Sequence, residues 1–284
     1  MIAELLAATA MWQTDPPLPL ARSEVAGASW RGGVAVVGGY LADGQSSARV
    51  DVYNARVGRW ERLPDLPVAV NHAMAASGGG RLYVFARSDA FVYDGRWRRL
   101  PSLPFSRVAG GAAFVDNTVY VVGGVGPLGV ARSALAYDVR RRRWRTLPAP
   151  RPLREHLGVT TLRGRVYAVG GRANGQTFST VQRWLPGRRR WQLLAPLPEP
   201  RGGTAAGAAH GLVVSAGAES AAGTSGAVYA YSPRENRWRR LPDLPTPRHG
   251  LAVVGDGATI HVVAGGPQPG LSVSSANESL LLTG

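Results

Sequence analysis

Residues 121–148 read VVGGVGPLGVARSALAYDVRRRRWRTLP, and the order of features in this stretch recurs along the chain. An apolar segment ends in a glycine pair, a Tyr-Asp dipeptide follows, and a tryptophan then precedes a Leu-Pro turn. Short β-branched and aromatic segments bounded by glycine and proline are typical of strands, and the stretch has no helical periodicity. The stretch therefore predicts short β-strands joined by tight turns.

Tryptophan gives the length of the repeat. The residues at this position are separated by 48, 37, 47, 47 and 47 residues, and they are Trp12, Trp60, Trp97, Trp144, Trp191 and Trp238. Ten residues after five of them stands an arginine, while the second copy has Val70 there; the five are Arg22, Arg107, Arg154, Arg201 and Arg248. Six copies of four short strands predict the blades of a β-propeller.

The glycine pair, the Tyr-Asp dipeptide and the Trp-x-x-Leu-Pro run closely resemble the kelch repeat of bacterial propellers, over nearly the whole chain. The resemblance implies an all-β, six-bladed propeller with four antiparallel strands per blade. We expect one domain over 1–284, with blades near 20–67, 68–104, 105–150, 151–198, 199–245, and 246–284 plus 1–19. The N-terminal strand would then close the ring in the C-terminal blade, although Leu5, seven residues before Trp12, leaves a closure with two strands from each end open.

The composition excludes several classes of chemistry. The chain has no cysteine, which excludes disulfides, thiolate metal sites and the cysteine-linked tyrosine of the kelch-type copper radical oxidases. All 33 basic residues are arginine, so no P-loop or Schiff-base lysine exists. No apolar run reaches the ~20 residues of a membrane span. The segment 1–11 contains Glu4 and no basic residue, so we expect no signal peptide, and a cytoplasmic or an exported location both remain open.

Propeller loops that join fourth to first strands and second to third strands gather on one face, around the mouth of the central channel. The kelch resemblance implies a ligand surface there, and we expect it to include Arg22, Tyr40, His72, Arg107, Arg154, Glu155, His156, Arg172, Asn174, Arg201, Arg248 and His249. Such residues could hold a polar or anionic small molecule or contact a protein. The alternative interpretation is that the arginines hydrogen-bond between blades and the histidines between loops.

We expect neither a metal nor a cofactor. Three histidines face the predicted mouth, but His72, His156 and His249 belong to alternate blades, which a wide channel would hold apart.

Three functions remain open. The first, which we favour, is a ligand- or protein-binding scaffold that acts through the mouth loops. The second is an enzyme resembling the sialic-acid mutarotases and epimerases, with Glu24, Glu155 and His156 as acid–base candidates. The third is a polyanion-binding module on the opposite face, whose turns carry runs such as Arg140–Arg143, although the absence of lysine also fits a coding bias toward arginine. We expect a monomer without a membrane span.

Overall fold

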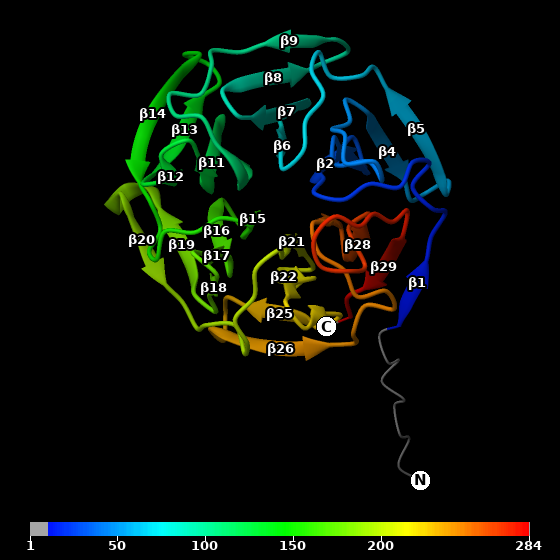
Figure 1. The fold of residues 1–284 in the computed structure, drawn as a ribbon. Helices are drawn as coiled ribbons and strands as arrows, with labels where there is room; N and C mark the ends of the chain where they lie inside the picture. Colours follow the sequence, from blue (N-terminus) through cyan, green and yellow to red (C-terminus); the bar gives the residue numbers. More distant parts are fainter. Residues whose placement is uncertain (1–10, 284) are drawn as a thin grey trace.

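The computed structural model describes residues 11–283 and shows six antiparallel sheets arranged around a central axis (Figure 1). Four main strands run outward from the axis in each sheet, so the predicted all-β, six-bladed propeller is confirmed. No helix among these residues is long and apolar enough to cross a membrane. The expectations about Leu5 and about a leader segment fall on residues 1–10, outside the described part of the chain.

The first three blades follow one another along the chain, each ordered from the channel outward. Blade 1 contains β2 (Ala26–Trp30), β3 (Gly33–Val37), β4 (Val50–Asn54) and β5 (Arg59–Leu63). Blade 2 contains β6 (Met74–Gly78), β7 (Arg81–Ala86), β8 (Asp89–Tyr93) and β9 (Trp97–Arg99). Blade 3 contains β10 (Val108–Val115), β11 (Thr118–Gly126), β13 (Ser133–Asp138) and β14 (Arg143–Pro148), with the short β12 (Gly129–Val130) paired to β11.

The other three blades repeat this order. Blade 4 contains β15 (Gly158–Leu162), β16 (Arg165–Val169), β19 (Val181–Leu185) and β20 (Arg190–Leu193), plus the hairpin of β17 (Arg172–Ala173) and β18 (Gln176–Thr177) and the 3-10 turn η1 (Pro186–Arg188). Blade 5 contains β21 (Ala205–Ala209), β22 (Leu212–Ala216), β25 (Val228–Ser232) and β26 (Arg237–Leu241), plus the hairpin of β23 (Glu219–Ser220) and β24 (Gly223–Thr224). Blade 6 contains β27 (Ala252–Asp256), β28 (Thr259–Val263), β29 (Asn277–Leu281) and β1 (Trp12–Thr14).

The two ends of the chain meet in blade 6. Strand β1 pairs antiparallel with β29, with Trp12 opposite Leu280, so one outer strand comes from the N-terminal side and three strands from the C-terminal side (Figure 1). Each sheet therefore has a neighbour on both sides, and the ring has no open end for another chain to pair with.

The repeated tryptophans tie the outer strands together. Each indole N–H donates to the main-chain carbonyl four residues after the tryptophan of the preceding blade, at 2.7–2.9 Å. Trp60 donates to Pro16, and Trp12 closes the circle by donating to Pro242. Tryptophan is suited to this position, because its large apolar ring can pack against neighbouring side chains while its indole N–H reaches a carbonyl at the outer edge of the blade.

Small residues line the axis because six inner strands converge there. Strand β21 has the sequence AAGAA and β2 has AGASW. A Cβ added at Gly111 would lie 2.4 Å from Val159 of the next blade, and one at Gly27 would lie 2.6 Å from Ala252. The side chains between neighbouring sheets form the apolar core; Val34, Val36 and Tyr53 of blade 1, for example, pack with Val254 and Val263 of blade 6.

The glycine pairs end the second strands where the next blade approaches. Gly38 and Gly39 have φ angles of +61° and +106°, and the Gly39 N–H donates to Val70 O of blade 2 at 2.8 Å. A Cβ on Gly39 would lie 2.6 Å from Ser23 O. The pairs are therefore required both by the left-handed backbone and by the close contact.

The five repeat arginines do not lie exposed at the mouth. Their exposed fractions are 0–2%, and each guanidinium bonds to groups of its own blade. Arg107 donates to Ser133 O at 2.6 Å, while Arg22 pairs with Asp51 and Arg248 with Glu278, each at 2.5 Å. This corrects the expectation that the side chains of Arg22, Arg107, Arg154, Arg201 and Arg248 line a ligand surface, because they are buried. The expected hydrogen bonds between blades are made by the main chain and not by the guanidinium groups. The carbonyls of Arg22, Arg154 and Arg201 accept from the N–H groups of Gly265, Gly124 and Gly171 of the preceding blade. The guanidinium groups bind carbonyls where the second and third strands separate.

Replacing Gly39 with alanine should lower the free energy of unfolding by roughly 2–4 kcal/mol, because it adds a clash with Ser23 to a left-handed backbone. The measurement is urea unfolding followed by tryptophan fluorescence. Gly187→Ala is the matched control, since a Cβ there meets no atom within 4 Å. Equal stabilities of the two variants would contradict this account of the glycine pairs.

Replacing Arg248 with methionine should destabilise the fold more than Arg107→Met does. Both arginines are buried, but only Arg248 neutralises a buried carboxylate, that of Glu278. Removing one partner of a buried ion pair costs about 3–5 kcal/mol, whereas losing hydrogen bonds from a guanidinium to main-chain carbonyls costs about 1–3 kcal/mol. Thermal or urea unfolding of the two variants tests the difference, and similar losses would show that the charge pair contributes little.

Candidate functional site

A ring of main-chain hydrogen bonds surrounds the axis at the channel mouth. Its members stand two residues after the repeat arginine position in each blade, and all six have a left-handed φ of +48° to +68°: Glu24, His72, Ala109, His156, Gly203 and Gly250. Each of the last five donates its N–H to the carbonyl of the member before it, at 2.7–3.2 Å. The N–H of Val25 donates to Gly250 O at 3.2 Å and closes the circle. We call these six residues the inner ring.

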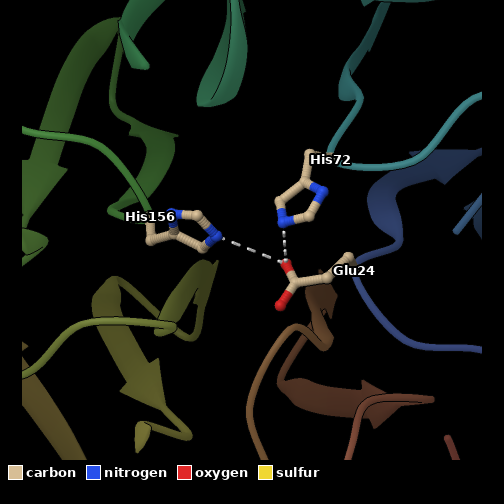
Figure 2. Close-up of side chains that lie close together, drawn as sticks. All are labelled: Glu24, His72 and His156. Atoms are coloured by element: carbon tan, nitrogen blue, oxygen red, sulfur yellow. Dashed lines mark ion pairs between the residues drawn. The ribbon is translucent and has the colours of Figure 1, made fainter. Parts of the chain in front are cut away.

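Three members of the inner ring bring titratable side chains together. The Glu24 carboxylate oxygen Oε2 lies 3.4 Å from His72 Nε2 and 3.8 Å from His156 Nε2 (Figure 2). The two imidazoles are nearly perpendicular, at 84°, with centroids 4.9 Å apart. Blades 1, 2 and 4 thus place one carboxylate and two imidazoles around a common point. The expectation that a wide channel separates the histidines is wrong, because the inner ring is narrow.

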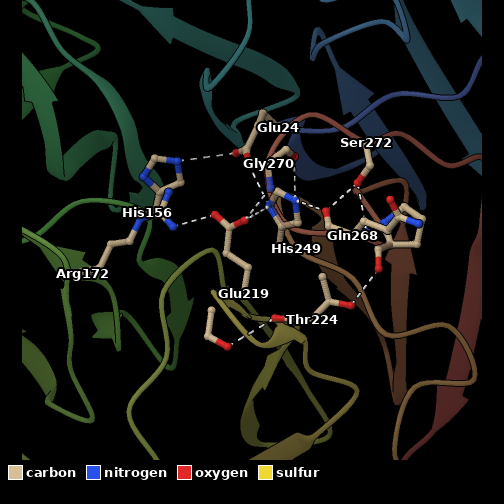
Figure 3. Close-up of polar contacts among 12 residues, drawn as sticks. Glu24, His156, Arg172, Glu219, Thr224, His249, Gln268, Gly270 and Ser272 are labelled. Atoms are coloured by element: carbon tan, nitrogen blue, oxygen red, sulfur yellow. Dashed lines mark hydrogen bonds and ion pairs between the residues drawn. The ribbon is translucent and has the colours of Figure 1, made fainter.

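A second charged group lies beside the first and shares Glu24. His249 Nδ1 lies 3.2 Å from Glu24 Oε1 and 3.4 Å from Glu219 Oε2. Arg172 bridges Glu155 and Glu219, with nitrogen–oxygen distances of 3.2 and 2.6 Å. Figure 3 shows the contact between Arg172 and Glu219. Glu155 in turn contacts His156 Nδ1. The two groups therefore form one network of three carboxylates, three histidines and one arginine.

The network sets the charge of each member. Burial by itself raises the pKa of Glu24, but His249, His72 and His156 outweigh it and lower that pKa to about 2. Burial lowers the pKa of His72, and it lowers that of His156 to about 4, against the opposing charge of Glu24. Burial also opposes a proton on His249, yet Glu24 and Glu219 raise its pKa. Near neutral pH, Glu24 is therefore ionised, and His72 and His156 are neutral.

The remaining predicted residues divide into two groups. The Tyr40 ring packs edge-on to His72 with centroids 5.5 Å apart, so it lines the network. Asn174 is exposed at the tip of the β17–β18 hairpin and makes no side-chain contact with the network.

The predicted ligand set omitted Glu219 and Asn71. Register places both residues in the mouth loops, Glu219 three residues after Ala216 and Asn71 directly after Val70, but it gave no reason to include them in the ligand set.

The axial space beneath the network is small. A cavity of about 100 Å³ is lined by the inner ring and the first residues of the inner strands. Pockets that enclose drug-sized ligands are typically ≈ 300–1,000 Å³. This cavity therefore has room for water molecules or an ion beneath Glu24, and too little for a bound sugar. Further along the axis, the inner strands line a second cavity of about 190 Å³.

The comparisons with known proteins identify the repeat. The Kelch motif matches residues 106–151 and 153–198, which contain blades 3 and 4. Kelch-like protein 36 of Mus musculus is 40% identical to this chain over 60 residues. That match covers 21% of this chain and 10% of the mouse protein, so the chain matches only a small part of its curated relative. The chain is thus a six-bladed β-propeller whose blades share one plan and whose blades 3 and 4 match the Kelch motif.

Proposed function

We propose that this propeller is a binding scaffold that holds an extended segment of a partner protein on its mouth face. The observation that carries the proposal is an open apolar cleft of about 760 Å³ beside the mouth, between residues 104–107 and the β11–β13 connection. Kelch motifs and the propeller fold support protein binding in general. In this cleft, two exposed apolar side chains border a concave surface, which is the kind of surface that such binding requires.

Two large apolar side chains border the cleft. Leu128 is 93% exposed and Phe105 is 50% exposed, and Pro104, Pro127 and Val130 extend the apolar wall. Exposed apolar residues gathered around a concavity are typical of interaction sites, whereas single ones are common on any surface. The exposed parts of these two side chains contribute nothing to packing within the chain. Their exposure therefore favours a contact with another molecule.

The cleft also indicates the chemistry of the partner. Arg132 is exposed on its wall, next to the apolar residues. A segment with one apolar anchor and one acidic side chain nearby would fill the cleft and pair with this guanidinium. The small axial cavity gives the mutarotase-like alternative no comparable support, because a sugar would have to bind above the charged network.

Replacing Leu128 with aspartate should weaken binding of such a segment by about 10- to 100-fold, since burying a leucine contributes about 1.5–3 kcal/mol. The measurement begins with selection of peptides from a displayed random library on the purified chain. The selected peptides are expected to share an apolar residue with an acidic residue close to it. Fluorescence anisotropy with one synthetic consensus peptide then gives the dissociation constants.

Val57→Asp is the matched control, because Val57 is 61% exposed but lies on a turn of the opposite face. It should bind the consensus peptide as the unsubstituted chain does. The proposal fails if no peptide is enriched. It also fails if the Leu128 and Val57 variants bind the peptide equally well.

A further inference from the structure

We propose that Glu24, His72 and His156 form a binding site for a divalent transition-metal ion of the zinc class at the centre of the inner ring. The proposal is separate from the cleft, which lies outside the channel in blade 3. It concerns the three side chains that meet at the common point between blades 1, 2 and 4 (Figure 2).

The distances fit a shared ion better than direct hydrogen bonds. The nitrogen–oxygen distances from Glu24 to His72 and His156 are 3.4 and 3.8 Å, beyond the 2.7–3.2 Å typical of N–H···O bonds. Ligand atoms about 2.1 Å from a tetrahedral zinc ion lie about 3.4 Å from one another. All three ligand atoms fall within 4.8 Å of each other, so small side-chain movements would bring them to coordination distance.

The other nitrogen of each imidazole already faces an acceptor. His72 Nδ1 lies 2.7 Å from the amide oxygen of Asn71, whose own N–H₂ group donates to Ser46 at 2.6 Å. His156 Nδ1 contacts the Glu155 carboxylate, which Arg172 holds in place. A proton on each Nδ1 leaves both Nε2 lone pairs directed at Glu24. Metal-binding histidines are oriented by outer partners of this kind.

The charges around the point favour a cation. The network contains three carboxylates, those of Glu24, Glu155 and Glu219, against two basic groups: Arg172 pairs with Glu155 and Glu219, and His249 lies between Glu24 and Glu219. Two nitrogen ligands also select zinc-class ions over Mg²⁺ and Ca²⁺, which prefer oxygen.

The neighbouring group of Glu24, Glu219 and His249 also meets the distance criterion. There, however, Glu219 already accepts from Arg172 at 2.6 Å and from the Gly270 N–H at 3.2 Å (Figure 3). We therefore place the ion on the His72 and His156 side of Glu24. The axial cavity borders this point, so water can complete the coordination, as in sites with three protein ligands.

The test is calorimetric titration of the EDTA-treated, dialysed chain with ZnCl₂, together with CoCl₂ titration followed by visible absorption. We expect one ion per chain, a Co²⁺ spectrum of tetrahedral intensity, a raised melting temperature with Zn²⁺, and no binding of Mg²⁺. His72→Ala and His156→Ala should each weaken binding of Zn²⁺ by at least about 100-fold, and Asn71→Ala by about 10-fold.

The alanine variants have a precedent within the chain, because Ala109 occupies the same ring position in blade 3 with φ +56°. Circular dichroism and melting temperature check that they fold. His210→Ala is the matched control, since His210 is exposed and also left-handed, at φ +48°, and it should bind Zn²⁺ normally. The proposal is overturned if the unsubstituted chain binds no Zn²⁺. It is also overturned if the His72 and His156 variants bind Zn²⁺ as tightly as the His210 variant does.

Discussion

At the channel mouth, consecutive blades are linked to one another by main-chain hydrogen bonds through residues with a left-handed backbone. Such a conformation costs a non-glycine residue about 1–2 kcal/mol, and glycine occupies it freely at Gly203 and Gly250. Glu24, Ala109, His72 and His156 adopt this left-handed conformation because the hydrogen bonds that close the ring require it at each of the six positions. The ring fixes the radius of the channel at its mouth, and the contacts of Glu24 with His72 and His156 follow from that radius.

The outer circle of tryptophan bonds complements the inner ring. One circle joins inner ends of blades through main-chain groups, and the other joins outer strands through indole N–H groups. Between them, the apolar faces of the sheets pack without needing polar contacts. A blade held at both ends has little freedom to tilt, so the side chains it directs to the axis keep their positions. A narrow, preorganised cluster is therefore a consequence of the repeat itself.

The sequence was sufficient to predict the fold, because the features that build a blade are local. The spacing of tryptophans and of pairs such as Gly123-Gly124 is set by strand and turn lengths. The site was predicted only in part. Register placed Glu24, His72 and His156 at the mouth, but it gave neither the radius of the inner ring nor the direction of a side chain. Arg248 and His249 are adjacent, yet one points into its blade and the other toward Glu24.

The uneven composition of the inner ring is an argument about what the centre does. Blades 3, 5 and 6 place alanine or glycine there, which shows that the ring closes without polar side chains. Blades 1, 2 and 4 place Glu24, His72 and His156 there, and ionisable groups that are largely shielded from water are costly even when they are paired. Stability alone therefore does not account for them. The proposed metal ion, held by one carboxylate and two imidazoles at a single point, would account for these three residues.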